Sequence, residues 1–202
     1  MYMMDDYYKD LISGKEMCSW IRLYYGVVSK VINENNFKKC AEVGIGYGLH
    51  AKEILDNTNI DHLYLIDPTK YYPNDDFAND VLKYGGFENL VKNIKLNLQP
   101  YNDKYTWYRK CSTDITNDEV PDEHLDLVFI DADHSYQAVT NDLNFWWKKI
   151  RKGGWLLGDD YGSIWPETKN AVNDWAAKMN FKIHFLFKPD TNYPIYYFIK
   201  DE

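Results

Sequence analysis

The chain has 202 residues, 45% hydrophobic and 27% charged, which suits one globular domain with a sizeable core. Its formal net charge of -8 disfavours a nucleic-acid substrate, because an acidic surface repels phosphate backbones. No run reaches the roughly 18 apolar residues of a membrane span, and the acidic N-terminus lacks signal-peptide features, so we expect a cytoplasmic protein. The three cysteines form no CxxC pair, so we expect neither disulfides nor a zinc site.

Strand and helix patterns alternate along most of the chain. An N-terminal helical region is expected near residues 5–35, so that a helical cap (1–36) precedes an α/β core (37–202). Helices are expected at 48–57, 87–99, 135–150 and 166–180, the third of them ending at the glycine pair 153–154. Strands are expected at 38–44, 62–67, 105–111, 125–131, 154–160, 181–187 and 195–200.

The last two expected strands are joined by KPDTNYP, which is too short for a helical crossover and makes that pair antiparallel. The pattern therefore predicts a doubly wound, mostly parallel, seven-stranded α/β sheet with a terminal antiparallel hairpin and N-terminal helices. In such sheets ligands bind beyond the carboxyl ends of the strands, so the residues that follow each strand carry the functional information.

A glycine loop, EVGIGYG, follows the first expected strand. Gly44, Gly46 and Gly48 let the backbone approach a ligand closely, although a tight strand-to-helix turn would explain them as well. The GxGxG spacing differs from the GxGxxG of dinucleotide sites, and the carboxylate of Glu42 suits a cation better than a pyrophosphate. S-adenosylmethionine, which carries a sulfonium and an ammonium, matches this charge.

Polar residues also follow the second and third expected strands. Asp67 can accept hydrogen bonds from ribose hydroxyls, while Pro68 behind it favours a simple turn cap as the alternative. Ser112, Thr113 and Asp114 could border an adenine ring, although such clusters commonly cap helices.

The blocks EVGIGYG, LID, CSTD, FIDADHSYQAV and GGWLLGDDYG stand in the order found in class I S-adenosylmethionine-dependent methyltransferases. Over roughly residues 38–200 the chain resembles metal-dependent macrocin and sugar O-methyltransferases, and more distantly catechol O-methyltransferases. The resemblance implies that the methionine part of the cofactor is held by Glu42, Gly44, Gly46 and Gly48. It also implies that Asp67 binds the ribose, and that Ser112 contacts the adenine together with neighbours such as Asp114.

His50 departs from the small hydroxyl residue that these enzymes often carry after the glycine loop. Two alternatives stay open for it. His50 either replaces that residue in contacting the methionine carboxylate of the cofactor, or it faces solvent on its helix.

Three carboxylates follow the fourth and fifth expected strands, at Asp131, Asp159 and Asp160. If these strands are neighbours, about 4.8 Å apart, the acids crowd together and need a compensating cation. Oxygen ligands suit Mg²⁺, Ca²⁺ or Mn²⁺. Helix capping is the alternative, but Asp133 and Ser135 can supply the caps by themselves.

Together these features predict an O-methyltransferase that transfers a methyl group to a hydroxyl of a small molecule, such as a sugar or nucleotide sugar, with a Mg²⁺-like ion activating the hydroxyl. The resemblance implies His134 as the base, with Asp133 as its rival. The alternatives are a metal-independent methyltransferase acting on an amine or carboxylate, a Rossmann-type NAD oxidoreductase and a silent binding protein. Acceptor specificity is expected from residues 1–35, 71–79 and 161–165, and a homodimer stays possible.

Overall fold

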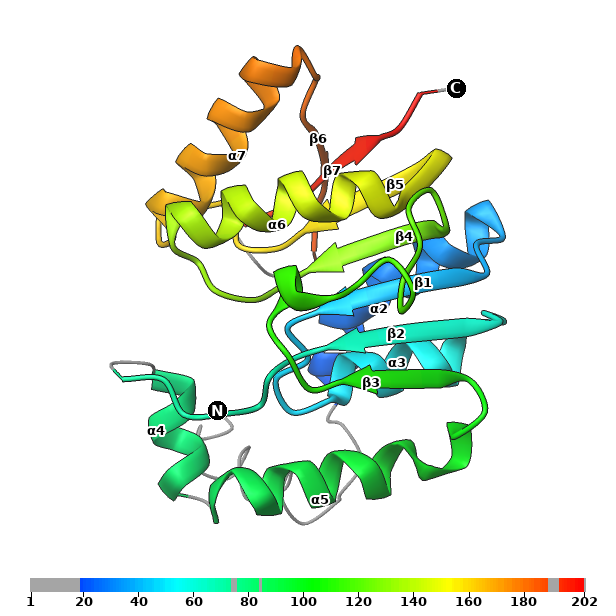
Figure 1. The fold of residues 1–202 in the computed structure, drawn as a ribbon, viewed down its shortest axis with the longest axis vertical. Coiled ribbons are helices and arrows are strands. Elements are labelled where there is room, and N and C mark those ends of the chain that lie inside the picture. The colour runs from blue at the N-terminus through cyan, green and yellow to red at the C-terminus, as the bar shows by residue number, and fades with distance from the viewer. Residues whose placement is uncertain (1–18, 74–75, 84, 189–192, 202) are drawn as a thin grey trace.

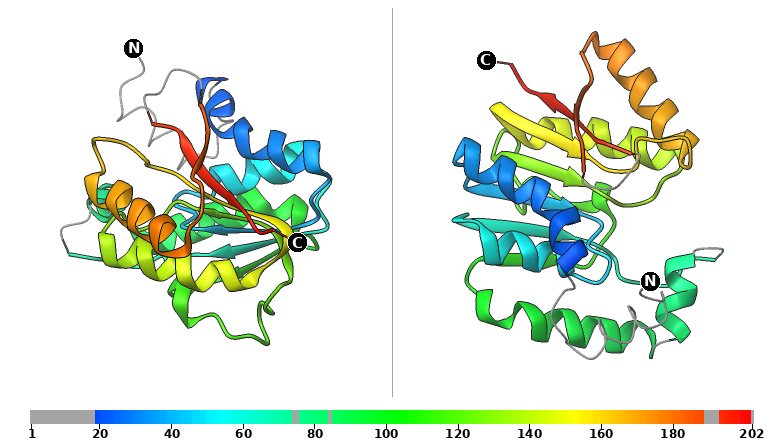
Figure 2. Two further views of the ribbon diagram at one scale, coloured as in Figure 1. Left: turned by 90° about the horizontal axis from the view of Figure 1, so that it is seen from above. Right: turned by 180° about the vertical axis from the view of Figure 1, so that it is seen from behind.

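The computed structural model describes residues 19–73, 76–83, 85–188 and 193–201, and the side chains among them apart from 19–25, 76 and 80. The first part of the expected N-terminal helical region, residues 1–18, lies outside the described residues. A central sheet is covered by helices on both faces (Figures 1 and 2). Within the described residues, no helix combines the length and the apolar character needed to cross a membrane.

Seven strands form one sheet in the order β3-β2-β1-β4-β5-β7-β6. Strands β1 to β5 are parallel to their neighbours, while β7 is antiparallel to both β5 and β6. This confirms the predicted doubly wound sheet and its terminal antiparallel pair. The strands are β1 (Lys39–Val43), β2 (His62–Ile66), β3 (Tyr105–Tyr108), β4 (Leu125–Ile130), β5 (Ile150–Gly158), β6 (His184–Leu186) and β7 (Ile195–Ile199).

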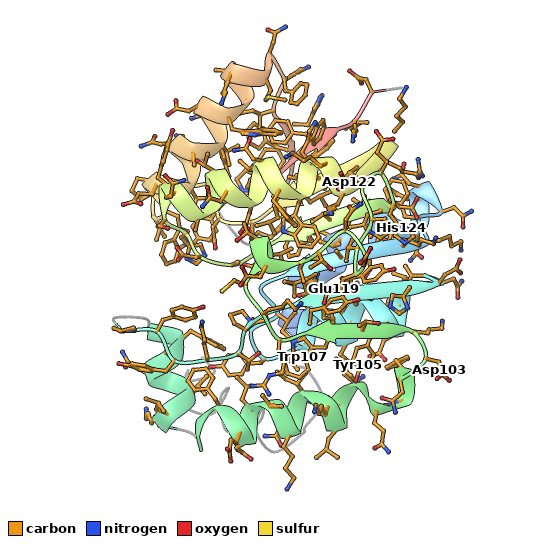
Figure 3. All side chains as sticks on the ribbon, viewed as in Figure 1. Asp103, Tyr105, Trp107, Glu119, Asp122 and His124 are labelled. Carbon is orange, nitrogen blue, oxygen red and sulfur yellow. The ribbon has the colours of Figure 1, made fainter. Side chains whose placement is uncertain are left out.

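Buried residues alternate between the two faces of the sheet, as the two-residue period of a strand requires. Helices α2 and α3 cover one face and α6 and α7 the other, while α5 lies along the β3 edge beside α3, and α4 contacts α5 (Figures 1 and 2). Tyr105 and Trp107 extend from the edge strand β3 on the α5 side (Figure 3). The helices are α2 (Ser19–Asn35), α3 (Leu49–Asn57), α4 (Asp76–Lys83), α5 (Gly86–Leu98), α6 (Tyr136–Lys149) and α7 (Pro166–Met179), with short 3₁₀ helices η1 (Gln99–Tyr101) and η2 (Ser112–Asp114).

The predicted boundary between the α6 helix and β5 was wrong. The helix ends at Lys149, and β5 begins at Ile150 rather than at Gly154. The register with β4 shifts at this point, because Leu125 pairs with Ile150 whereas Leu127 pairs with Trp155. The glycine pair therefore belongs to an irregularity inside the strand instead of ending the helix, and Gly153 has the positive φ of +74° that such a bulge accommodates.

The carboxyl ends of β1, β4 and β5 lie side by side at one edge of the sheet (Figure 1). In the register, Val43 pairs with Ile130, which in turn pairs with Gly158. The glycine loop, Asp131 and Asp159 consequently leave the sheet next to one another. This confirms that the two carboxylate-bearing strands are neighbours.

Candidate active site

The glycine loop leaves β1 and runs directly against the loop that follows β4. A Cβ atom at Gly44 would lie 2.0 Å from the carbonyl oxygen of Asp131, and φ at Gly44 is +83°, so only glycine fits there. At Gly46 a Cβ would meet nothing closer than Phe77, at 4.0 Å. At Gly48 the nearest neighbour would be Ile94, at 3.0 Å. Of the three positions, Gly46 therefore leaves the most room for a ligand.

Glu42 and His50 form a buried pair beneath this loop. Nδ1 of His50 lies 3.1 Å from Oε1 of Glu42, and the side chains are 5% and 2% exposed. Oε2 of Glu42 is buried with no hydrogen-bond partner among the described residues. His50 is therefore buried rather than facing solvent on its helix, and its predicted contact with the methionine carboxylate of the cofactor stays a prediction.

Asp67 holds the glycine loop from the end of β2. Its Oδ2 accepts hydrogen bonds from the backbone N–H groups of Ile45 and Gly46, at 3.0 and 3.3 Å. Its Oδ1 accepts from the backbone N–H of Thr69 at 2.6 Å. The turn-cap alternative is therefore present in the structure. The half-buried carboxylate still stands beside the open space at Gly46, so its predicted ribose contact stays a prediction.

Ser112 connects the end of β3 to helix α6. Its hydroxyl donates to Asp142 and accepts a hydrogen bond from Nε1 of Trp146 at 3.3 Å. Burial raises the pKa of Asp142 to about 6, against the lowering effect of the Ser112 hydroxyl. Asp114, in the same 3₁₀ helix, is exposed. The predicted adenine contacts of Ser112 and Asp114 stay predictions. In the structure the hydroxyl of Ser112 is hydrogen-bonded to side chains of helix α6.

The acidic cluster contains two of the predicted metal ligands and the predicted base. Ligand atoms of Asp131, His134 and Asp160 all lie within 4.8 Å of one another, and Nε2 of His134 is 2.6 Å from Oδ2 of Asp160. Burial first, and then the charges of Asp159 and Asp160, raise the pKa of Asp131 well above its usual range. A cation would relieve this crowding.

His134 is held on two sides. Its ring stacks on Trp165, with centroids 4.1 Å apart and planes 23° apart, while Asp160 contacts its Nε2. Burial disfavours the imidazolium, but the hydrogen bond to Asp160 and the surrounding carboxylates outweigh it and raise the pKa of His134. Asp133 is exposed and its Oδ1 accepts from the backbone N–H of Ser135 at 2.7 Å, which makes it a turn cap as well as the rival base.

Asp159 faces a different partner from its neighbour Asp160. Its carboxylate pairs with the ammonium of Lys188, and the two side chains are 3% and 1% exposed. Asp159 is not among the three residues whose ligand atoms lie within 4.8 Å of one another, but its charge still raises the pKa of Asp131. Its predicted role as a metal ligand stays a prediction. Lys188 was not anticipated, because a single lysine after an expected strand carries no sequence signal of a partner 29 residues away.

Residues 41–161, more than half of the chain, match the sequence family described as a methyltransferase domain. A protein of Acanthamoeba polyphaga mimivirus, named only as uncharacterized, is 29% identical over 184 residues, which cover 87% of this chain and 75% of that protein.

Two solved structures illustrate the similarity of fold. The O-methyltransferase NovP superimposes with a TM-score of 0.60 at 17% identity, over 96% of this chain and 88% of NovP. TrmK of M. capricolum, solved with the cofactor product S-adenosyl-homocysteine, gives a TM-score of 0.61 at 16% identity, over 93% of this chain and 70% of TrmK. At these identities the similarity establishes the fold.

Proposed function

Because the chain belongs to this methyltransferase family, and is thus a class I enzyme that uses S-adenosylmethionine, we propose that it methylates a hydroxyl of a sugar-like small molecule with the help of a divalent metal ion. The observation that carries the proposal is the cluster of Asp131, His134 and Asp160 directly beside the glycine loop. The net charge of -8 supports a small acceptor over a nucleic acid. The family rules out the NAD oxidoreductase that the loop alone left open.

The residues around the glycine loop fit S-adenosylmethionine. The buried Oε2 of Glu42, which has no hydrogen-bond partner among the described residues, is an acceptor for a cationic group. The space at Gly46 admits the ligand chain, and Asp67 at the same loop can take the ribose hydroxyls. When bound, the cofactor supplies an electrophilic methyl group on a sulfonium.

The cluster also fits a divalent ion. Asp131 and Asp160 offer carboxylate oxygens, which hard cations prefer, and a cation there would offset the burial and the neighbouring carboxylates that raise the pKa of Asp131. We assign Asp131 and Asp160 as ligands and leave His134 as the base, because His134 is held by stacking on Trp165 as well as by Asp160. When bound, the ion would stabilise the ionised hydroxyl of the acceptor.

The protein groups then have separate tasks. His134 takes the proton of the acceptor hydroxyl, and the carboxylate of Asp160 stabilises the resulting imidazolium. With the cofactor bound, the acceptor oxygen would form its bond to the methyl carbon as the bond from that carbon to sulfur breaks, so that S-adenosylhomocysteine would be released as a thioether. The proton stays on His134 until solvent removes it.

The direct contact of His134 with Asp160 also supports a second candidate, a metal-independent methyltransferase in which these two residues act as the whole acid-base pair. The test is release of S-adenosylhomocysteine from S-adenosylmethionine and a panel of nucleotide sugars and catechols, measured by mass spectrometry. EDTA should abolish turnover and Mg²⁺ should restore it, while affinity for the cofactor is unchanged. Full activity in EDTA would favour the second candidate.

Variants assign the roles in the same assay. Asp160→Asn should behave like EDTA treatment, whereas His134→Ala should keep the metal and lower the rate by about 10²–10⁴. Asp118→Asn, at an exposed aspartate outside the cluster, is the matched control and should leave the rate unchanged. A fully active His134→Ala variant would remove His134 from the reaction.

A further inference from the structure

We propose that His50 is a positioning residue for the cofactor, which keeps the Glu42 carboxylate ionised and fixed for the cationic methionine end of S-adenosylmethionine. This inference rests on the cofactor site proposed above, in which Glu42 receives that end. It adds a residue to that site, because His50 contacts the glutamate, whereas no His50 atom lies within 4 Å of a Cβ placed at Gly46.

The pair spans two elements that frame the glycine loop. Glu42 is on β1, immediately before the loop, and His50 is in the first turn of α3, immediately after it. Nδ1 of His50 and Oε1 of Glu42 are 3.1 Å apart, and neither side chain is more than 5% exposed. The imidazole also packs edge-on against Phe129 of β4, with ring centroids 4.8 Å apart. The contact therefore fixes one carboxylate oxygen and leaves Oε2 for a ligand.

The charge of a second carboxylate, on Glu53, also raises the pKa of His50. Glu53 follows on the same helix, and it is 4% exposed. Its Oε2 accepts a hydrogen bond of 2.5 Å from the hydroxyl of Ser29 on α2, and its Oε1 accepts one of 3.1 Å from Nδ2 of Asn57. These bonds keep Glu53 in place near the imidazole, where its charge favours the protonated ring.

Burial and neighbouring charges act in opposite directions on the pKa values of Glu42 and His50. Burial raises the pKa of Glu42, and His50 opposes that rise, while Asp67 adds to it. Burial lowers the pKa of His50, but Glu42, Glu53 and Asp159 outweigh it, so the net shift is upward. The charge of Glu42 in turn helps to raise the pKa of Asp131 at the end of β4. Without the imidazolium of His50, the pKa of Glu42 would rise further. A protonated Glu42 carries no charge and would no longer attract a cation.

The experiment compares wild type with His50→Gln, which can still donate a hydrogen bond to Glu42 but carries no charge. The dissociation constant of S-adenosylhomocysteine is measured by calorimetry at about pH 6 and about pH 8. The affinity of the variant should be about tenfold weaker than wild type at the lower pH, and this deficit should shrink at the higher pH, because a rising pH favours the ionised carboxylate of Glu42. Wild type should vary by less than about threefold across the range.

Two further variants complete the test. Glu42→Gln has no carboxylate to ionise and should bind weakly at both pH values, which keeps the inference testable even if His50→Gln does not fold. His124→Gln, at the opposite end of the sheet (Figure 3), is the control and should match wild type.

The outcomes separate the two proposals. Equal affinities of His50→Gln and wild type at about pH 6, or an equal weakening of the variant at both pH values, would overturn the positioning role. Native affinity in Glu42→Gln would overturn it as well. If wild type itself does not bind S-adenosylhomocysteine, the cofactor site fails rather than the role of His50.

Discussion

Replacing Lys188 with methionine removes the ammonium from a buried carboxylate. Lys188 and Asp159 are 1% and 3% exposed, so water cannot take over the missing charge. Breaking a buried ion pair at one partner costs about 3–5 kcal/mol. Proton uptake by an ordinary aspartate at neutral pH costs about 4 kcal/mol, which sets an upper limit on that loss. We therefore expect Lys188→Met to lose about 3–4 kcal/mol and to melt about 6–16 °C lower.

The assay is urea unfolding at neutral pH, followed by circular dichroism. The double variant Asp159→Asn/Lys188→Met should regain most of the loss, because it leaves no charge to compensate. Lys30→Met is the matched control, since Lys30 pairs with Glu34 at 3.8 Å with both side chains more than 60% exposed, and it should cost less than about 0.5 kcal/mol. A loss below about 1 kcal/mol in Lys188→Met would refute the reasoning.

Three other perturbations test the same structure. Burial raises the pKa of Asp142 to about 6, so between about pH 4 and pH 6 the folded protein holds a proton that the unfolded chain releases. The free energy of unfolding should therefore fall by about 3 kcal/mol as the pH rises through this range. Urea titrations of Asp142→Asn should lack this pH dependence. Gly44→Ala should abolish S-adenosylhomocysteine binding in calorimetry, whereas Gly26→Ala, whose Cβ would come no closer than 3.9 Å to a neighbour, should keep it. Asp67→Ala should weaken that binding by about 1.5–3 kcal/mol, and unchanged affinity would exclude a ribose contact.

The order of elements was predictable because the sheet is built from local patterns. Each strand of the parallel part is a short apolar run with a polar or glycine residue at its carboxyl end, and this fixes which residues meet at the functional edge. The α4 helix was not predicted, since its eight residues lie in a long irregular segment. The early start of β5 was hidden by its glycine pair, which reads as a helix end unless the pairing with β4 is known.

The partners of the site residues were less predictable than their positions. Asp131 and Asp160 meet as expected because their strands are neighbours. Asp159 and Asp160 are adjacent in sequence, yet one pairs with Lys188 and the other with His134, because successive residues leave the strand in different directions and Asp160 has a φ of +59°. Which side chain fills the space beside an acid depends on packing between distant segments, and the sequence carries no local signal of it.

The contact between Gly44 and the carbonyl oxygen of Asp131 limits how this enzyme could be redesigned. A virtual Cβ separation of 2.0 Å leaves no free volume between the two loops. An insertion next to Asp131, or any shift of its backbone toward Gly44, would therefore displace the glycine loop as well. Such a change would be selected against because cofactor binding would be lost. A mutant library aimed at a new acceptor should keep these two positions constant, retain Trp165 for its stacking on His134, and place its diversity at residues 161–164, where Ile164 is exposed.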